Sequence, residues 1–489
     1  MRRLIGFILL GGITVTALFG QLKRDPRSVG LAGAYGTVAD GIYAVGYNPA
    51  LLAYQADKPF MMQLVGFDFG LVSNYVSMSN LNAISGDTLF DKDINAILRM
   101  LEPSGGLTLT PDIHFATPVL NFASGNLAIT SNTLIIGDLT LPLGFVELML
   151  RGNAANPNLD LTMNYEILGV TELGLSFAVP YDQFSIGVTL KYLQGLFYFG
   201  VDPDSSHSNL ITTDDYLYGS GRYYLRQGIG GSGVGLDLGF ATRRTTSGWQ
   251  FGASLINASG KIKWNNPSFV KDLLAGNDKI YGNKDDLFHF TWNGQALNDS
   301  MAVIYSFTID STNMSGLSNA NNFTNDQSII YNLDKNGNLK AFTTNYPGIF
   351  RLGGSRLTKN YLFTSDIWTG FQNRFFARAH WRWAFGVEFL RFPTTPLRLG
   401  YAWGGSDFKE LAMGFGIHKG PVIFDFGFAF RNGIWIHTMK GLNLSLGLTI
   451  TGFGSRKETI HDPAAVPAPV VEEPNEVPVE KESVSEGQN

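Results

Sequence analysis

Ionisable side chains recur within stretches that are otherwise apolar, and their spacing is the first sign of chemistry in this chain. From 422 to 431, phenylalanine takes alternate positions, whereas Asp425 shares the other face with glycine and alanine. Charges on a face of small residues need partners or water. They indicate either a ladder of ion pairs inside the protein or a polar track for a substrate. The residues that we assign to this polar face are Lys191, Asp237, Arg382, Glu388, Arg398 and Asp425.

Other chemistry is largely excluded. The chain has no cysteine, so disulfides, zinc–thiolate sites, iron–sulfur clusters and cysteine nucleophiles are absent. Its seven histidines are scattered without metal-ligand spacing, and its net charge of −5 gives no sign of nucleic-acid binding. Gly228–Gly233 matches G-x-G-x-x-G, but a strand follows where a dinucleotide site needs a helix, so we interpret it as a turn or bulge. We predict no catalytic, cofactor or metal site and no enzymatic activity.

The alternation that places these charges also predicts the fold. Large apolar residues occupy one face of each stretch and small or polar residues the other, which is typical of β-strands. Charged residues make up only 16% of the chain and aromatics 13%, and Trp403 and Tyr401 lie near a strand end, as in an interfacial girdle. We therefore predict an all-β transmembrane antiparallel barrel of about 14 strands over residues 57–453. A secreted β-sandwich is the alternative.

The N-terminus carries two features. Residues 1–20 have two arginines followed by an apolar run shorter than the ~20 residues of a spanning helix, which indicates a cleaved secretory signal peptide. The stretch from Asp25 to Tyr54 is rich in glycine and alanine, so it could lie close to another backbone. Asn48 suits a helix cap and Pro49 the first helical position, which predicts a short helical turn from Ala50.

Five further segments depart from the strand pattern. Residues 91–101 and 141–150 are predicted as helices too short to span a bilayer, in the lumen or at a barrel mouth. The polar stretches 201–227 and 257–347 are predicted as extracellular loops, and the second is long enough to contain strands of its own. After the last strand, residues 454–489 are rich in proline and glutamate, which predicts a disordered acidic tail in the periplasm.

The order of an export signal, the R-S-x-G-L-A-G-A-Y run, N-P-A and many strands resembles the long-chain fatty-acid transporter superfamily of outer-membrane barrels. The chain is also similar to an uncharacterised Bacteroidetes-type group of such barrels, and the shuttle barrel of type IX secretion is a relative. This resemblance implies that residues 21–56 form an N-terminal hatch inside the lumen. The residues that it implies for the hatch or gate are Arg27, Gly30, Gly33, Asp40, Asn48, Pro49 and Ala50.

Two functions remain open from the sequence. The first is passive transport of hydrophobic small molecules across the bacterial outer membrane, through a porin-like lumen gated by the hatch. The second is a non-transporting assembly or secretion-associated scaffold that binds a periplasmic or secretion-system protein through its loops or tail. Both place the barrel wall against outer-membrane lipid. An apolar lumen near residues 48–54 would favour transport, and a filled polar lumen would favour the scaffold.

Overall fold

The computed structural model describes residues 25–452, except for 56–59, 86–87, 154, 203, 214–216, 373–374, 376–378, 406–408 and parts of 266–340. Within 266–340 it describes residues 272, 275–280, 283–285, 291–292, 295–296, 301–312, 323–330 and 335–336. The expected signal peptide and acidic tail therefore lie outside the described residues.

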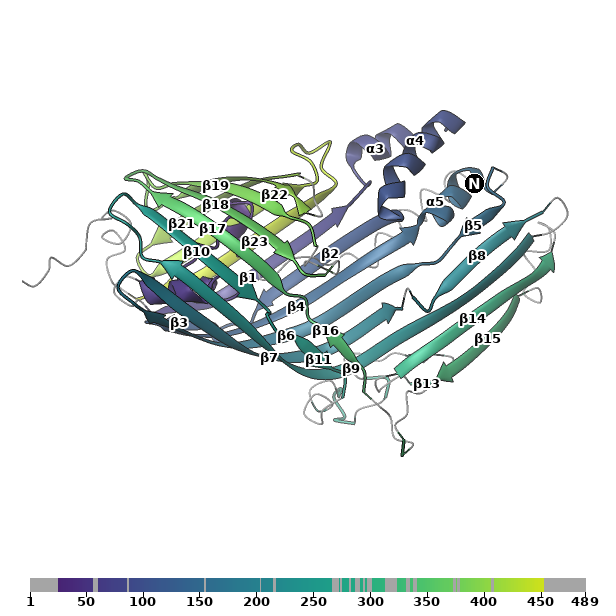
Figure 1. The fold of residues 1–489 in the computed structure, drawn as a ribbon, viewed down its shortest axis with the longest axis horizontal. Helices are drawn as coiled ribbons and strands as arrows, with labels where there is room; N and C mark the ends of the chain where they lie inside the picture. Colours follow the sequence, from purple (N-terminus) through teal and green to yellow (C-terminus); the bar gives the residue numbers. More distant parts are fainter. Residues whose placement is uncertain are drawn as a thin grey trace, which may run out of the picture.

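Among the described residues, antiparallel pairing closes into a ring of 14 strands, because β1 pairs with both β2 and β23. Each strand of the ring pairs with the next, as in the barrel predicted from the sequence (Figure 1). In ring order the strands are β1 (Met61–Ser73), β2 (Gly106–Ala116), β4 (Leu127–Pro142), β6 (Asn164–Pro180), β7 (Phe184–Val201), β9 (Leu217–Thr242), β10 (Trp249–Ile256), β17 (Ile349–Leu357), β18 (Tyr361–Gly370), β19 (Arg382–Phe389), β20 (Leu397–Gly404), β21 (Lys409–Lys419), β22 (Val422–Arg431) and β23 (Gly441–Thr451).

The connections distinguish the two ends of the barrel. Tight turns join β6 to β7, β17 to β18 and β21 to β22 at one end, whereas the connections at the other end are longer. Outer-membrane barrels have short periplasmic turns and long outer loops, so we refer to these as the periplasmic and outer ends. The short β3 (Phe122–Ser124) belongs to the periplasmic end, where it pairs with β1 and β4.

Both polar stretches contain strands, which the sequence prediction allowed for the second stretch only. From 201 to 227 the chain forms β8 (His207–Thr212) and the first half of the 26-residue β9. The described part of 257–347 contributes β11 (Lys261–Lys263), β14 (Met301–Thr312), β15 (Phe323–Ile330) and β16 (Thr343–Asn345), and a separate hairpin, β12 (Thr291–Trp292) with β13 (Gln295–Ala296).

These strands extend the sheet beyond the barrel on one side, because β9 pairs with β8 on one edge and β14 on the other (Figure 1). β5 (Asn158–Asp160) continues this extension by pairing with β8. The polar composition of residues 201–227 led to the loop prediction, although buried and more exposed residues alternate along β9 from Leu217 to Arg222.

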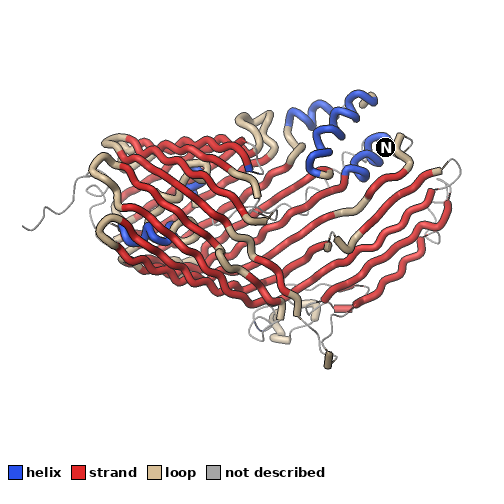
Figure 2. The backbone as a smooth tube through the Cα atoms, viewed as in Figure 1, coloured by secondary structure: helices blue, strands red, loops and turns tan. Residues whose placement is uncertain are grey.

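Among the described residues, three helices lie at the outer end, at the opposite end of the barrel from the short helical turns of residues 25–55 (Figure 2). They are α3 (Met78–Ile84), α4 (Asp91–Leu101), which continues into the 3₁₀ turn η3 (Glu102–Ser104), and α5 (Leu143–Arg151). α4 has the bounds predicted from the sequence, and its buried Ile97 and Leu101 pack towards α5. α5 starts two residues later than predicted, because β4 continues to Pro142.

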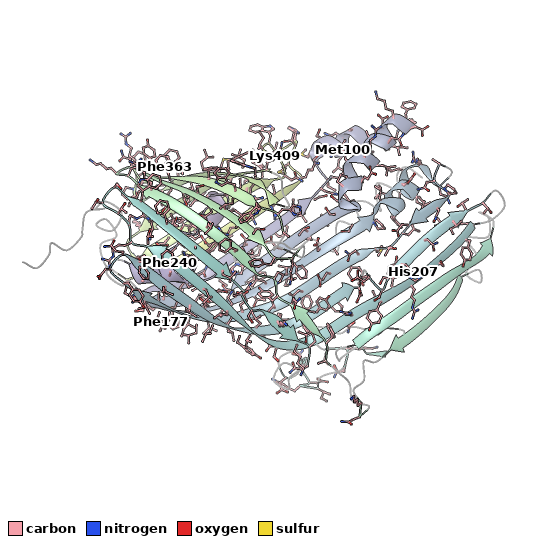
Figure 3. The ribbon with its side chains drawn as sticks, viewed as in Figure 1. Met100, Phe177, His207, Phe240, Phe363 and Lys409 are labelled. Atoms are coloured by element: carbon pink, nitrogen blue, oxygen red, sulfur yellow. The ribbon has the colours of Figure 1, made fainter. Side chains whose placement is uncertain are left out.

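The outward faces of the ring strands are apolar. Phe177, Phe240 and Phe363 project outwards from the barrel wall and are about half exposed (Figure 3). The residues beside them in sequence point inwards and are buried. Aromatic rings gather at both ends of the barrel. The ring centroids of Trp383 and Trp403 lie 5.0 Å apart near the outer end, and those of Tyr361 and Phe389 lie 5.6 Å apart near the periplasmic end. An apolar band between two aromatic girdles is the surface of an outer-membrane barrel.

None of the helices among the described residues has the length and hydropathy required to cross a membrane.

Candidate functional site: the N-terminal segment in the barrel lumen

Residues 25–55, here called the N-terminal segment, lie inside the periplasmic half of the barrel (purple in Figure 1). The segment contains α2 (Pro26–Gly30) and the 3₁₀ helices η1 (Gly41–Ala44) and η2 (Pro49–Tyr54). α2 contacts β20 to β23, η1 contacts β1 and β4, and η2 contacts β6, β7 and β9. Because these strands lie on different sides of the ring and present their small or polar faces, the segment occupies the lumen.

Side-chain caps explain why the segment folds locally. The Asp25 carboxylate accepts hydrogen bonds from the backbone N–H groups of Arg27 and Ser28, which begins α2. The Asn48 side-chain oxygen accepts one from Ala50 N at 3.2 Å, and Pro49 occupies the first position of η2. The short turn predicted after Asn48 is present, as a 3₁₀ rather than an α-helix.

Glycines on the wall strands make room for the segment. A Cβ atom at Gly400 would overlap the backbone of Leu31 and Ala32, and one at Gly187 would overlap Pro49 and Ala50. Gly30 of α2 faces Gly414 of β21, where an added Cβ would lie 3.0 Å from the Gly414 Cα. The small lumen face of the strands therefore exists because backbone packs against backbone there.

A buried ion pair of the wall binds the middle of the segment. Asp366 on β18 accepts hydrogen bonds from Tyr35 N at 2.9 Å and Gly36 N at 2.6 Å, and pairs with Arg351 on β17 at 2.8 Å. Arg351 donates to the Gly33 carbonyl at 2.6 Å and lies over the Trp368 ring. A Cβ at Gly33, whose φ is +85°, would approach that ring to 3.0 Å.

A second network joins α2 to four wall strands, β19 to β22. Arg27 contacts Glu388 on β19 at 2.7 Å, and Glu388 contacts Arg398 on β20 at 2.9 Å. Arg398 in turn reaches Asp425 on β22 at 2.7 Å, and His418 lies 3.1 Å from the same carboxylate. Arg27 also contacts Asp40 at 3.3 Å, so one guanidinium joins two parts of the segment to the wall.

Asn48 connects the segment to the opposite wall. Its amide nitrogen donates to the Gly36 carbonyl at 3.1 Å and to the Phe240 carbonyl on β9 at 3.0 Å, while its oxygen caps η2. Gly239 and Gly252 leave the space that this side chain fills. Asn48 is thus a cap and a wall contact at once.

We expect Asn48→Ala to lower the free energy of unfolding by about 1–2 kcal/mol, because it removes a cap and two buried hydrogen bonds. Urea unfolding of the barrel reconstituted in lipid would measure the change. Asn48→Asp is the matched control, since it keeps the capping oxygen but cannot donate to Phe240. If Asn48→Ala unfolds at the wild-type midpoint, the wall contact contributes nothing.

A third charged cluster lies within the wall itself. Lys191 on β7 contacts Asp237 on β9 at 3.0 Å and Glu172 on β6 at 3.6 Å, and donates to the Asn257 side-chain oxygen at 2.9 Å. Tyr346 donates to Glu172 at 2.5 Å. All five residues are at least nine-tenths buried. The cluster therefore joins three strands to both ends of the connection between β10 and β17 without facing bulk water.

The six predicted polar-face residues are all buried on the lumen side, but they do not form one track. Glu388, Arg398 and Asp425 belong to the network of Arg27, and Lys191 pairs with Asp237. Arg382 belongs to neither, because it pairs with Glu410 on β21 at 2.7 Å.

Sequence reasoning missed several members of these clusters. They are Glu172, Asn257, Tyr346, Arg351, Asp366 and Glu410. Arg351 and Asp366 could have been found, because each alternates with small or apolar residues on a strand. The partnership of Tyr346 with Glu172 carries no signal in the sequence.

An apolar layer lies on the outer side of these charges. On β6, β7 and β4 the lumen-facing positions next towards the outer end are Val170, Leu193 and Leu134, all at most 1% exposed. The outer connections add Trp264, Tyr346 and Phe375 to the same cluster. On the outer side of the charged clusters, the lumen is therefore filled by aliphatic and aromatic side chains.

The glycines of the G-x-G-x-x-G match lie inside β9 and accommodate Trp264. Added Cβ atoms at Gly228 and Gly231 would come within 2.7–2.9 Å of its indole ring, and Gly230 has φ +71°. The indole nitrogen donates to Thr344 at 3.0 Å. The motif is thus part of a continuous strand that packs against a ring, and not the turn or bulge expected from the sequence, because its register with β7 does not shift from Gly228 to Gly235.

Burial controls the ionisation of the tyrosines in the segment. Desolvation raises the pKa of Tyr43 well above its usual range, and its hydroxyl is hydrogen-bonded to Thr449 at 2.7 Å. No group of three or more His, Cys, Asp or Glu side chains that could hold a metal ion occurs among the described residues.

Comparisons with known proteins complete the description of the site. A family of unknown function (DUF5723) matches residues 49–227, less than half of the chain. No curated protein matches this chain.

Solved structures that resemble it cover most of both chains at low identity. The toluene transporter TbuX of Ralstonia pickettii is 12% identical, with 87% of this chain and 98% of that chain covered and a TM-score of 0.48. A FadL homologue of Pseudomonas aeruginosa is 12% identical (89% and 99% covered, TM-score 0.44), and the toluene transporter TodX of Pseudomonas putida is 9% identical (88% and 97%, 0.38). Because these TM-scores are below 0.5, the likenesses assign no substrate to this chain. The barrel fold is established by the strand pairing described above.

Proposed function

We propose that this protein is an outer-membrane channel for the passive transport of hydrophobic small molecules, and that the N-terminal segment is a hatch in its lumen. The apolar layer is the observation that supports transport of such compounds. A lumen filled by Leu134, Val170, Leu193 and Trp264 disfavours hydrated solutes, because a polar solute would lose its water there without gaining hydrogen bonds. A hydrophobic compound would instead exchange water for apolar contacts.

The contacts of the segment support its role as the hatch. It touches wall strands on different sides of the ring, so it obstructs the periplasmic half of the lumen. We assign the hatch residues as Arg27, Gly30, Gly33, Asp40, Asn48, Pro49 and Ala50. Arg27 and Asn48 hold the segment to opposite walls, and the glycines provide close contact.

We propose different roles for the charged clusters. Glu388, Arg398 and Asp425 act as the wall side of the hatch contact, because they bind Arg27 directly or through one another. Lys191, Asp237 and Arg382 act as ties between strands. A polar route for a substrate is not supported, since each of these side chains already has an ionic partner within 3.0 Å.

The resemblance to the fatty-acid transporter superfamily, including the Bacteroidetes-type group, supports the same proposal. Within it, residues 1–20 act as a cleaved signal peptide and residues 454–489 as a periplasmic tail. The alternative, a scaffold that binds a protein through its loops or tail, was expected to have a filled polar lumen. The apolar layer on the outer side of the charged clusters does not match that expectation.

Hydrophobic dye uptake tests this proposal. Cells that make the protein should take up N-phenyl-1-naphthylamine faster than cells that lack it, and deletion of residues 27–54 should increase the rate severalfold. The deletion empties the periplasmic half of the lumen and removes no residue of the ring strands. Folding of the deletion variant is checked by its heat-dependent mobility in gels.

The outcomes separate the two parts of the proposal. If a folded deletion variant takes up the dye no faster than the wild type, the segment is not a hatch. If neither protein changes uptake relative to cells without it, the transport function itself is wrong.

A further inference from the structure

A cluster of exposed apolar side chains lies at the outer end of the barrel, apart from the lumen. The loop between β22 and β23 places Ile434, Trp435 and Ile436 in succession, with 46%, 64% and 47% of each side chain exposed. Met78 and Leu81 of α3 are 48% and 38% exposed. We call these five residues the apolar ledge. Exposed apolar side chains that gather in this way suggest a surface that meets more than water.

Backbone and side-chain contacts hold the two halves of the ledge together. Ser79 N donates to the His437 carbonyl at 2.9 Å, and the Asn432 amide donates to the Ser73 carbonyl at 3.3 Å. The Trp435 carbonyl accepts from Thr438 N and Met439 N, which makes a compact turn. The exposure of the ledge is therefore a property of a folded loop packed on residues 73–79.

The ledge continues the lipid-facing surface of the barrel. Phe430 and Leu442 form the last outward pair of β22 and β23, and Leu442 is opposite Leu71 of β1. Only Arg431, Asn432 and Gly433 separate Phe430 from Ile434. The apolar band thus runs from the strands into the loop without an intervening stretch of exposed charge.

Basic groups accompany the ledge. Lys440, at the end of the same loop, donates to the Asn74 carbonyl at 2.7 Å. Burial and the nearby charge of Lys409 lower the pKa of Lys440; Lys409 lies at the outer edge of the barrel (Figure 3). Cations beside apolar residues at a membrane boundary suit acidic lipid headgroups, which would reduce the repulsion between the two amines.

From this continuity and charge we infer that the apolar ledge inserts into the outer leaflet and rests on lipid acyl chains, so that α3 and the β22–β23 loop form a membrane-seated rim on one side of the barrel. Trp435 is the central contact, because an indole suits the boundary between acyl chains and headgroups. The inference concerns the outer rim and holds whether or not the lumen transports anything.

Lipid quenching of a fluorophore tests the ledge, and the absence of cysteine makes single-site labelling simple. Three full-length variants, Ile434→Cys, Leu190→Cys and Asp204→Cys, are labelled with an environment-sensitive dye and reconstituted in phosphatidylcholine vesicles with or without bromine on the acyl chains. Leu190 is 60% exposed on the outward face of β7 and serves as the lipid control. Asp204 lies in the exposed turn between β7 and β8 and serves as the water control.

We expect the dye at 434 to be quenched by brominated lipid to nearly the extent seen at 190, and severalfold more than at 204. Quenching at 434 as low as at 204 would overturn the inference. It would show that the ledge is covered by water or by a second copy of the chain instead of lipid. If Ile434→Cys does not fold, Ile436→Cys provides the same readout from the other side of Trp435.

Discussion

Replacing Asp366 by alanine is expected to free the middle of the N-terminal segment from the barrel wall. The substitution removes the acceptor of the Tyr35 and Gly36 amides and leaves Arg351 buried without its carboxylate. Breaking a buried pair by removing one partner costs about 3 kcal/mol or more. Hydrogen exchange of the Tyr35 and Gly36 amides should then accelerate by on the order of a hundredfold, because 1.4 kcal/mol corresponds to tenfold.

Two control variants separate the loss of the hydrogen-bond acceptor from a general loss of stability. Asp366→Asn keeps an oxygen acceptor but loses the charge, so it should give a smaller acceleration. Asp202→Ala breaks the partly exposed pair with Arg226 and should change stability by less than about 1 kcal/mol. Unchanged exchange at residues 35 and 36 in Asp366→Ala would show that the segment is held by its other contacts.

Gly400→Leu is expected to displace α2 from the lumen, because even a Cβ at this position would overlap the backbone of Leu31 and Ala32. Overpacking usually costs about 1–3 kcal/mol when neighbours can adjust, but here the obstructing atoms belong to the main chain. Movement of the segment is therefore the easier response. It should expose the Arg27–Ser28 bond to trypsin and raise dye uptake towards that of the deletion variant.

The control is a glycine on the other face of the wall. Gly354 of β17 faces Phe251 at the lipid surface, where an added Cβ would lie 3.3 Å from that ring, the end of a side chain that can shift. Gly354→Leu should leave both trypsin cleavage and dye uptake at wild-type levels. Equal effects of the two substitutions would mean that barrel destabilisation, rather than displacement of the segment, is being measured.

The strands and the local shape of the N-terminal segment could be predicted from the sequence, because both depend on short-range patterns. Alternation of large apolar with small residues identifies strands whose two faces meet lipid and a crowded lumen. Asn48-Pro49 specifies a helical start through chemistry contained in two residues. The lumen-facing position of the six charged residues likewise follows from the period of two.

The partners of these charges could not be predicted, because they depend on how neighbouring strands are staggered. Arg398 on β20 reaches Asp425 on β22 across the intervening β21, where Gly416 leaves space beside that carboxylate. Lys191 meets Asp237 although its register partner on β9 is Gly235. Such diagonal contacts divide one predicted track into separate clusters.

The sequence by itself determined a barrel with a small-residue segment ahead of it, since hydrophobic period and helix caps are local properties. Only the tertiary structure decided that Asp366 binds that segment, that residues 201–227 extend the sheet, and that Trp264 and Phe375 fill the lumen with apolar side chains. These features join residues far apart in the chain. Their energies come from burial and pairing, which exist only once the ring of strands has closed.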